Sequence, residues 1–474
     1  MWSPHQNKHS GLSGTVWSKL EWYQKDAVQK ALKVKTLALF MEQGTGKTWV
    51  AGGVIEQLVS PSFTGIVVAN LNNLDTTWFT FVRTHLPQIK LCKSLKHFKV
   101  AKTPKLLVTH YEGLKSSIKW LRKQSLTLIA YDEAQRLKTR STQQSRDAAK
   151  LAGCAPYKMI LTGTPIEEYP LDLWAQFRFL KPGLLGLAWK DFARQFMTNP
   201  IDFKKYRPGS FKFRRAIASG LIKKPEFNFK KLPQFLDLIR PYSLRVDASV
   251  LGLEDMTIEP TPVDLLGYQR RLYDEMDQNF LINRRRLKVT ASLTITQIGK
   301  LQQLSGGFVY DDRDQLHYVG RAKLRKTKYL LKRSTGPWLV FCKYRPEIDM
   351  LASELKGQYN FKVIHGGIKK ADRVAIVRSF QSGKLDGLIC QLKTGGVGLD
   401  LYASNYVVCY SISHSRIDFE QLRKRVHRRG QTRAVRLFLL YGVGTIDENL
   451  IEIVSRKNRS SDRTLTPLIQ RRRS

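Results

Sequence analysis

Short apolar runs recur along this chain, and each is followed by a polar or glycine-containing turn and then by a longer amphipathic stretch. Runs rich in β-branched residues and apolar on both faces are typical of strands buried in a parallel sheet, and the stretches between them are typical of crossover helices. Five runs in the first half begin at Thr36, Gly65, Lys105, Leu126 and Lys158. Five more in the second half begin at Trp338, Phe361, Gly387, Tyr406 and Val435.

Two such blocks predict an α/β fold with two tandem parallel-sheet lobes, whose ligands bind beyond the carboxyl ends of the strands. A chain of 474 residues is long enough for two or three domains. Strand signals are sparse between the blocks, which predicts mostly helical insertions there. The expected division is an N-terminal segment over 1–16, lobe 1 over 17–180, helical insertions and a linker over 181–327, lobe 2 over 328–457 and a basic tail over 458–474.

The charge of the chain points to a polyanionic partner. It contains 80 lysine and arginine residues against 39 aspartate and glutamate residues, which leaves a formal charge of +41. Neutralising phosphates releases condensed counterions, so nucleic acid is the expected partner, and an anionic membrane surface is the alternative. No segment approaches the ~20 apolar residues of a membrane span, and the first residues show no apolar signal core. We expect a cytoplasmic protein, associated with the nucleoid or, for a phage protein, in the host cytoplasm.

The most informative motif is a glycine-rich loop, MEQGTGKT, between a predicted strand and a predicted helix. Its glycines can turn several backbone N–H groups towards a phosphate, Lys47 supplies a positive charge for the β and γ phosphates, and Thr48 can hold Mg²⁺. The strict form of this motif begins with glycine, where this chain has Met41. The predicted cofactors are ATP and Mg²⁺, and the predicted cofactor-binding residues of the loop are Gly44, Thr45, Gly46, Lys47 and Thr48.

An acidic pair follows a second buried strand, in LTLIAYDEAQRLK. A carboxylate at the end of a buried strand suits Mg²⁺, so Asp132 and Thr48 are the predicted metal ligands. The adjacent Glu133 can orient and deprotonate an attacking water, which makes Glu133 and Lys47 the predicted catalytic residues of lobe 1. An ordinary acidic turn after a strand is the alternative.

A basic segment near the carboxyl end, QLRKRVHRRGQ, offers a second set of groups for hydrolysis. Gln421, Arg425 and Arg428 stand four and three residues apart, which predicts that they share one helix face. Guanidinium groups that reach a γ-phosphate stabilise the charge of the transition state. On this segment alone, a basic helix that lies on the phosphates of DNA or RNA is an equal alternative.

The order of these segments resembles a superfamily 2 helicase core, and specifically its Swi/Snf-like DNA translocase branch in the compact form of phage and bacterial members. The resemblance runs from about Leu20 to Lys457. LEWYQKDAV resembles the segment that reads adenine, with Gln24 as the base contact, and MEQGTGKT resembles the family's form of the phosphate loop. YDEAQ resembles the acidic box, with Gln135 where many members have histidine. LTGTPIEEYPLDLWAQFRFLKPG resembles the segment that couples hydrolysis to motion and is the most branch-specific of these motifs.

In the second block, KTGGVGLDL resembles the loop that couples nucleic acid to nucleotide, which implies nucleotide contacts for Gly398 and Asp400. QLRKRVHRRGQ followed by GTIDENLIE resembles the arginine-finger segment, which favours Arg425 and Arg428 as fingers and Gln421 as a nucleotide contact. The resemblance also implies two recombinase-like lobes of the P-loop NTPase type with helical insertions between them. No accessory module fits in the remaining residues, so we expect a bare motor that acts as a monomer.

The resemblance further implies residues that grip the sugar-phosphate backbone without reading sequence. Each of them has a structural alternative, because strand ends routinely carry polar residues. The candidates are Asn70, Trp78, Thr109 and Tyr111 in lobe 1, and Lys343, His365, Gly366 and Thr394 in lobe 2.

Taken together, these features predict a DNA-dependent ATPase whose lobes close on ATP and Mg²⁺ and step along duplex or forked DNA. A helicase that separates strands of DNA or RNA would share the same ATP chemistry. A nucleic-acid-binding protein with a decayed or switch-like ATP site is the alternative from another class.

Overall fold

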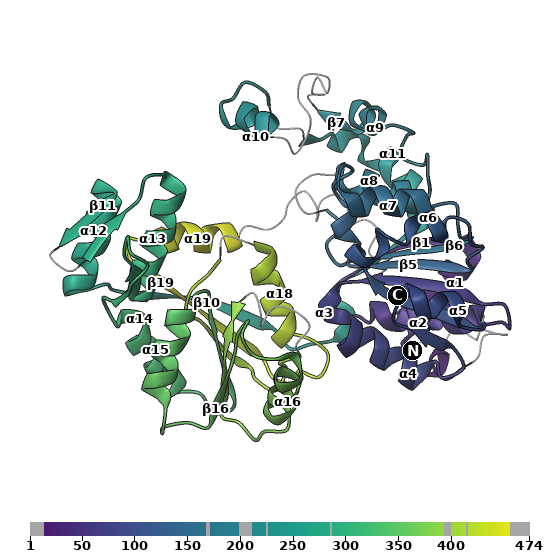
Figure 1. Ribbon diagram of the computed structural model, residues 1–474. Helices are drawn as coiled ribbons and strands as arrows, with labels where there is room; N and C mark the ends of the chain where they lie inside the picture. The colour runs from purple at the N-terminus through teal and green to yellow at the C-terminus, as the bar shows by residue number, and fades with distance from the viewer. Residues whose placement is uncertain are drawn as a thin grey trace, which may run out of the picture. The chain divides into compact units, whose positions relative to one another are not determined.

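The computed structural model describes residues 14–166, 171–198, 211–223, 226–284, 287–392, 400–413 and 416–455. They form two compact units that divide after Val250. Each unit is built around one parallel β-sheet with helices on its faces (Figure 1). The α/β fold with two parallel-sheet lobes, predicted from the apolar runs, is therefore confirmed.

The first unit contains a seven-stranded sheet in which every neighbouring pair of strands is parallel. Its strands, in spatial order, are β3 (Lys90–Cys92), β4 (Lys105–His110), β2 (Thr64–Ala69), β5 (Leu128–Asp132), β6 (Tyr157–Leu161), β1 (Thr36–Met41) and β9 (Ser243–Val246). Its helices are α1 (Trp22–Val34), α2 (Lys47–Leu58), α3 (Leu71–Asn73), α4 (Thr80–His85), α5 (Leu95–Val100), α6 (Ile118–Leu121), α7 (Gln143–Leu151), α8 (Leu171–Leu180), α9 (Trp189–Phe196), α10 (Phe211–Ala218) and α11 (Leu232–Ile239). Strands β7 (Met197–Thr198) and β8 (Glu226–Phe227) form a separate antiparallel pair.

This sheet is buried on both faces, which explains why its strands are apolar throughout. Alternate residues of a strand point to opposite faces, so Ala38 and Phe40 join one core while Leu37, Leu39 and Met41 join another. Residues of α6, α7 and α8 complete the first core, and residues of α1, α2 and α4 complete the second. Most polar groups of the sheet therefore lie at the ends of its strands.

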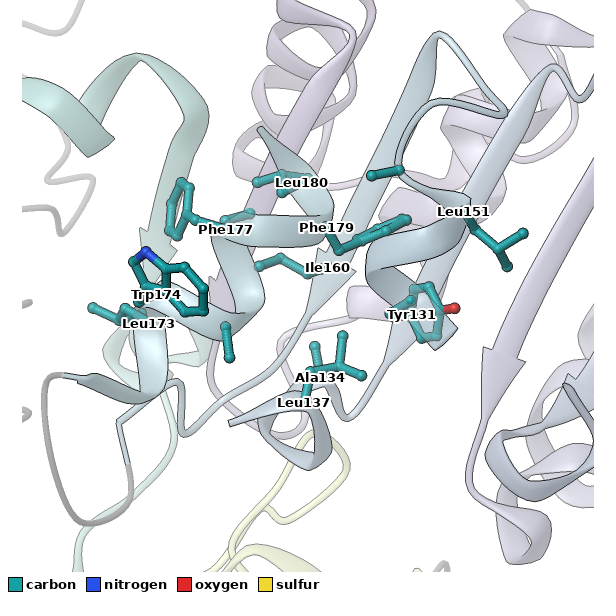
Figure 2. Packing of buried hydrophobic residues seen from close by; sticks show 14 of the residues in the cluster. Tyr131, Ala134, Leu137, Leu151, Ile160, Leu173, Trp174, Phe177, Phe179 and Leu180 are labelled. Atoms are coloured by element: carbon teal, nitrogen blue, oxygen red, sulfur yellow. The ribbon is translucent and has the colours of Figure 1, made fainter. Parts of the chain in front are cut away.

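Helix α8 supplies large aromatic residues to the first core (Figure 2). The ring of Phe179 meets the ring of Tyr131 on β5 edge-on, with centroids 4.7 Å apart, and Phe177 meets Phe40 at 6.5 Å. These contacts join the helix that follows the TGTP segment to β5, which leads into the acidic pair, and to β1, which leads into the glycine-rich loop.

The second unit contains a six-stranded parallel sheet. Its strands, in spatial order, are β10 (Met256–Val263), β19 (Val435–Gly442), β18 (Tyr406–Cys409), β15 (Trp338–Cys342), β17 (Gly387–Gln391) and β16 (Phe361–Ile364). Its helices are α12 (Gly267–Asn279), α13 (Thr294–Gly306), α14 (Ala322–Leu331), α15 (Arg345–Leu355), α16 (Lys370–Gln381), α18 (Arg416–Val426) and α19 (Ile446–Ser455). Two hairpins, β11 (Leu281–Arg284) with β12 (Leu287–Thr290) and β13 (Phe308–Tyr310) with β14 (Leu316–Tyr318), accompany them.

All ten apolar runs predicted as strands are strands of these two sheets. Strands β3, β9 and β10 were not predicted, and β9 and β10 lie in the region expected to be mostly helical. All three are edge strands, and β3 and β9 have only three and four residues. Strand β10 contains Pro260 and Pro262, which an edge strand tolerates because one of its sides needs no ladder hydrogen bonds. None of these three strands therefore needs the apolar pattern by which buried strands are recognised.

None of the helices in the described ranges combines the length and the apolar composition that crossing a bilayer requires.

A cluster of buried charges lies in the core of the second unit. The ammonium group of Lys323 lies 2.7 Å from Asp447, and both side chains are almost fully buried. Nearby, Glu347 accepts hydrogen bonds from the backbone N–H of Tyr344 at 3.0 Å and from the hydroxyl of Ser411 at 2.5 Å. Burial raises the pKa of Glu347 to about 7, because these partners only partly offset the loss of water.

Removal of the Tyr131 hydroxyl should stabilise the first unit. The hydroxyl oxygen is buried and has no hydrogen-bond partner within the described part of the chain. An unsatisfied buried polar group costs about 1–3 kcal/mol, so Tyr131→Phe should raise the free energy of unfolding by about 1 kcal/mol. Phe179→Ala, in the same core, should lower it by about 3–5 kcal/mol. Denaturant unfolding of both variants measures the difference, and a loss of stability in Tyr131→Phe would contradict the prediction.

The buried Glu347 should make the stability of the second unit depend on pH. An unfolded glutamate titrates near 4.3 and Glu347 in the fold at about 7, so the folded state holds its proton longer. Its contribution is therefore complete below about pH 4 and is lost as pH rises to 7, by on the order of 3 kcal/mol. Unfolding measured from pH 4 to 8 should show this decline in the wild type and a flatter curve in Glu347→Gln. The control Glu354→Gln, whose carboxylate is paired at the surface with Lys328, should keep the decline.

Candidate nucleotide-binding site

The glycine-rich loop connects β1, which ends at Met41, to α2, which begins at Lys47. Gly44 and Gly46 have φ angles of +87° and +89°, in the left-handed region that favours glycine. A Cβ atom on Gly46 would also lie 2.2 Å from Nε2 of Gln24. Gly46 is thus required both by its backbone and by its neighbour.

In this structure the lysine of the loop is buried and folded back over its own loop. The ammonium group of Lys47 donates to the carbonyl oxygens of Met41 at 2.9 Å and Glu42 at 3.4 Å. The Thr45 hydroxyl donates to the Glu42 carbonyl at 2.7 Å, and Thr48 lies half-buried in the first turn of α2. The N-terminus of a helix favours negative charge, so a phosphate here would meet the helix N–H groups together with the lysine.

Gln24, the predicted adenine contact, braces the loop from α1. Its Oε1 accepts from the backbone N–H of Glu21 at 3.0 Å, and its Nε2 donates to the carbonyl oxygen of Thr45 at 2.9 Å. The hydroxyl of Tyr23 donates to the same carbonyl at 3.1 Å. Both ends of the Gln24 amide are therefore in use here, and its contact with adenine stays a prediction.

Asp132 lies at the carboxyl end of β5 and is buried. One carboxylate oxygen accepts from the indole N–H of Trp78 at 3.0 Å, and the other accepts from the backbone N–H of Glu133 at 3.0 Å. Burial, with a smaller effect from the charge of Glu133, raises the pKa of Asp132 to about 6, and the Trp78 hydrogen bond opposes this rise. A buried carboxylate of this kind is suited to receive a cation.

Glu133 is linked by hydrogen bonds to the TGTP segment. Its carboxylate accepts from Nε2 of Gln135 at 2.8 Å, and Oε1 of Gln135 accepts from the hydroxyl of Thr162 at 2.6 Å. The backbone of Glu133 has a φ of +54°, a strained conformation for a residue with a side chain. A side chain on Gly163 would come within 3.2 Å of the Met41 carbonyl oxygen, so the TGTP segment also packs against the phosphate loop.

Trp78 and Tyr111, predicted to contact nucleic acid, are buried beside the acidic pair. Trp78 is 0% exposed, and its indole N–H is bonded to Asp132. Tyr111 is 3% exposed, and its hydroxyl donates to the carbonyl oxygen of Asp132 at 2.7 Å. Neither side chain presents a surface to a nucleic acid, because tertiary packing directs both into the unit. Their positions support the acidic turn from inside instead.

Asn70 and Thr109 are half-buried near the carboxyl ends of β2 and β4. Oδ1 of Asn70 accepts from the guanidinium of Arg136 at 2.7 Å, and the same guanidinium lies 2.8 Å from Glu112. Arg136, which the sequence analysis did not single out, thus joins the ends of three neighbouring strands. Contact between nucleic acid and Asn70 or Thr109 stays a prediction.

Glu42 ties the phosphate loop to the end of the unit. Its backbone N–H donates to the carbonyl oxygen of Val246 at 2.9 Å, and its carboxylate accepts from the backbone N–H of Ala248 at 3.1 Å. Val246 ends β9, and the unit itself ends at Val250. No sequence pattern indicated this link, because β9 was not predicted.

The basic segment of the second unit forms α18 and the turn that follows it. Gln421 and Arg425 lie on α18, whereas Arg428 lies beyond its last residue, Val426. The predicted shared helix face therefore includes only Gln421 and Arg425, because the chain leaves the helix ahead of Gly430, whose φ is +101°. Arg425 is buried, and its carbonyl oxygen accepts from the N–H of Leu401 at 3.0 Å.

Arg428, a predicted finger, forms an ion pair with Asp400, a predicted nucleotide contact, within the second unit. The side chain of Asp400 is half exposed, so a phosphate can compete with this carboxylate for the guanidinium. Gly398 and Thr394 lie outside the described residues. Roles for Arg425, Arg428 and Gln421 at a nucleotide stay predictions.

Lys343, His365 and Gly366 follow the carboxyl ends of β15 and β16. The ammonium group of Lys343 is hydrogen-bonded to Gln302. Nδ1 of His365 accepts from Arg345 at 2.8 Å, and burial together with this guanidinium lowers the pKa of His365. Gly366 is exposed at the same edge of the sheet. Their contacts with nucleic acid stay predictions.

Comparison with known proteins places the chain in a family. An uncharacterized ATP-dependent helicase of Mycoplasma genitalium is 25% identical over an alignment 479 residues long, gaps included. The alignment covers 96% of this chain and 43% of that protein. A putative ATP-dependent helicase/translocase of Bacillus subtilis is 26% identical over 364 residues, which cover 74% of this chain and 36% of that protein. The chain thus spans less than half the length of these curated relatives.

Among solved structures, a SWI2/SNF2 ATPase core of Sulfolobus solfataricus in complex with double-stranded DNA is 21% identical, covers 94% of this chain and 92% of that chain, and has a TM-score of 0.42. A family model described as the helicase conserved C-terminal domain matches residues 322–430. The model described as the SNF2-related domain matches residues 20–308, more than half of the 474 residues, and the chain belongs to this SNF2-related family.

Proposed function

We propose that this chain is an ATP-driven motor that moves along double-stranded or forked DNA. The observation that carries the proposal is the arrangement at the carboxyl edge of the first sheet, in a chain of the SNF2-related family. There the phosphate loop, Asp132 and Glu133 lie together, and Gln135 links Glu133 to Thr162 of the TGTP segment. Glu133, the proposed base, is thus connected through Gln135 to the TGTP segment.

ATP binding in this proposal relies on the loop and α2. The phosphates replace the Met41 and Glu42 carbonyl oxygens as acceptors for the Lys47 ammonium group. A hydrogen bond to a charged phosphate oxygen is stronger than one to a neutral carbonyl, which favours the exchange. Mg²⁺ fits the donor set of Thr48 hydroxyl and Asp132 carboxylate, because this ion prefers oxygen ligands. When bound, it neutralises phosphate charge, and it also offsets the burial that raises the pKa of Asp132.

Hydrolysis needs a base and a positive charge at the γ-phosphate. Glu133 orients and deprotonates the attacking water, and the amide of Gln135 fixes the direction of its carboxylate. Arg425 and Arg428 of the second unit serve as fingers, with Gln421 and Asp400 close to the nucleotide. The ion pair between Arg428 and Asp400 must open for this, so binding of ATP and release of Arg428 are coupled.

Movement along DNA needs a grip that does not read bases. The charge of +41 supplies sequence-independent attraction to phosphates. The candidates for local contacts are Asn70, Thr109, Lys343, His365, Gly366 and Thr394. Among the relatives, one human protein carries the name DNA annealing helicase and endonuclease, and a yeast protein the name DNA repair and recombination protein, which supports DNA as the track.

The ATPase rate should depend on duplex DNA. We expect blunt duplex to stimulate ATP hydrolysis at least as well as single-stranded DNA or RNA, in assays at one stated salt concentration because binding to phosphates is salt-dependent. Lys47→Ala should abolish the stimulated rate, since the γ-phosphate loses its cation. Activation mainly by single strands would favour a strand-separating helicase. A rate unchanged by Lys47→Ala would favour a nucleic-acid-binding protein with a decayed ATP site.

Trp78→Phe should weaken the response to Mg²⁺ without weakening DNA binding. The variant removes the indole N–H that holds Asp132 and leaves an aromatic ring, of smaller size, at the buried position. Loss of such a supporting hydrogen bond costs about 10–100-fold in metal affinity or activity. Titration of ATPase rate against Mg²⁺ should therefore shift by about 10-fold, whereas the nucleotide-free Kd for DNA should not change. The control Trp120→Phe, on α6, should change neither quantity. A higher Kd of Trp78→Phe for DNA would instead support the predicted contact between Trp78 and nucleic acid.

A further inference from the structure

We propose that the outer face of α14 is a second surface for the phosphate backbone of nucleic acid, separate from the carboxyl edge of the sheet. We call this face the α14 surface, and it consists of Arg325, Lys326, Tyr329, Lys332 and Arg333. The inference rests on the proposed function, because it assumes that the chain holds nucleic acid.

Helical spacing places these residues on one side of α14. Leu324 and Leu330 face the core of the second unit, whereas Arg325 and Tyr329, four residues apart, are exposed. Lys332 and Arg333 continue the row in the turn after the helix and are also exposed. At about 1.5 Å per residue, side chains four apart are about 6 Å apart along the axis.

The ring of Tyr329 has two cations close to it. The ammonium of Lys326 lies 5.6 Å from its centroid and the guanidinium of Arg333 lies 5.2 Å from it, and Arg333 also donates to its hydroxyl. Tyr329 is still 52% exposed. A large aromatic ring at an exposed position, ordered by neighbouring cations, provides a face on which sugars or bases can lie.

Three cations of the α14 surface differ from the neighbouring cations in their pairing. Arg321 and Lys328, on the adjacent side of the same helix, both pair with Glu354, and the buried Lys323 pairs with Asp447. Within the described ranges, by contrast, Arg325, Lys326 and Lys332 form no ion pair. Their charges repel one another, so an external polyanion relieves a repulsion that the fold leaves in place.

The position of α14 separates this surface from the predicted contacts of the motor. Helix α14 leads into the amino end of β15, where Trp338 is aligned with Tyr406 of β18, and Tyr406 is aligned with Arg436 of β19. The predicted contacts Lys343 and His365 follow the carboxyl ends of β15 and β16, at the other edge of the same sheet. Figure 1 shows α14 and α15 next to each other beside this sheet.

A nucleic-acid backbone fits this row better than a folded acidic protein does. A duplex carries one charge per about 1.7 Å of axis, so every cation of the row finds a phosphate without a fixed register. The chain already carries +41, which repels other basic proteins and attracts any acidic polymer. A contact of this kind would hold a stretch of DNA beyond the one that the motor site grips.

The test compares two triple variants of the full chain that remove the same charge. The first variant combines Arg325→Gln, Lys332→Gln and Arg333→Gln. The second variant changes three exposed lysines of the same unit to Gln, namely Lys356, Lys362 and Lys384. The Kd for a blunt duplex is measured without nucleotide over a range of salt concentrations. Each lost phosphate contact reduces the slope of log K against log salt by about 1, so the first variant should lose about 3 and the second none.

Further measurements separate the outcomes. The double variant Arg325→Lys, Arg333→Lys, which keeps the charge, should keep the slope, and the first triple variant should keep the wild-type ATPase rate at saturating DNA. Equal slopes in the two triple variants would overturn the α14 surface. A first variant that keeps its DNA slope but loses binding to polyglutamate would also overturn it, in favour of an acidic protein partner. A wild type whose ATPase does not respond to DNA would contradict the proposed function itself, which is a different failure.

Discussion

The parallel pairing of β6 with both β1 and β5 determines where chemistry is possible in the first unit. Leu39 of β1 and Asp132 of β5 are both aligned with Leu161 of β6, so the three strands end at nearly the same level. Because the strands are largely apolar on both faces, the polar groups that a ligand could reach lie where the strands stop. The phosphate loop, the acidic pair and the TGTP segment each begin at such an end, which is why residues far apart in the chain meet there.

Hydrogen bonds connect the phosphate loop to segments outside the nucleotide pocket. On one side Gln24 of α1 holds the Thr45 carbonyl, and on another Glu42 holds the backbone of Ala248 at the exit of the unit. Lys47 is bonded to the same loop carbonyls that a phosphate would replace as its acceptors. A change in the hydrogen-bond acceptors of Lys47 therefore acts on a loop that is also bonded to α1 and to the segment after β9. Tightly packed structures of this kind shift between discrete arrangements and do not deform gradually.

Local patterns predicted the ten main strands and the positions of the loop and the acidic pair, because a buried parallel strand and a glycine loop carry their signal in adjacent residues. Burial set by tertiary packing was beyond such patterns. Trp78 and Tyr111 occur in segments that resemble nucleic-acid contacts, yet both point inward, and only the fold reveals the indole N–H of Trp78 on Asp132. The edge strands β3, β9 and β10 were not predicted for a different reason, because an edge strand needs no apolar pattern on both faces.

Gln135 shows how a departure from a family pattern can preserve its chemistry. The residue at this position donates a hydrogen bond to Glu133 and accepts one from Thr162 at the same time. A glutamine amide does both, with its Nε2 and its Oε1. A neutral histidine ring also offers one donor and one acceptor, so the two residue types can make the same connection. They differ in that a histidine takes up a proton near pH 6.5 and then loses its acceptor, whereas an amide does not titrate. The glutamine therefore keeps the link between the acidic pair and the TGTP segment intact across the pH range in which a histidine would break it.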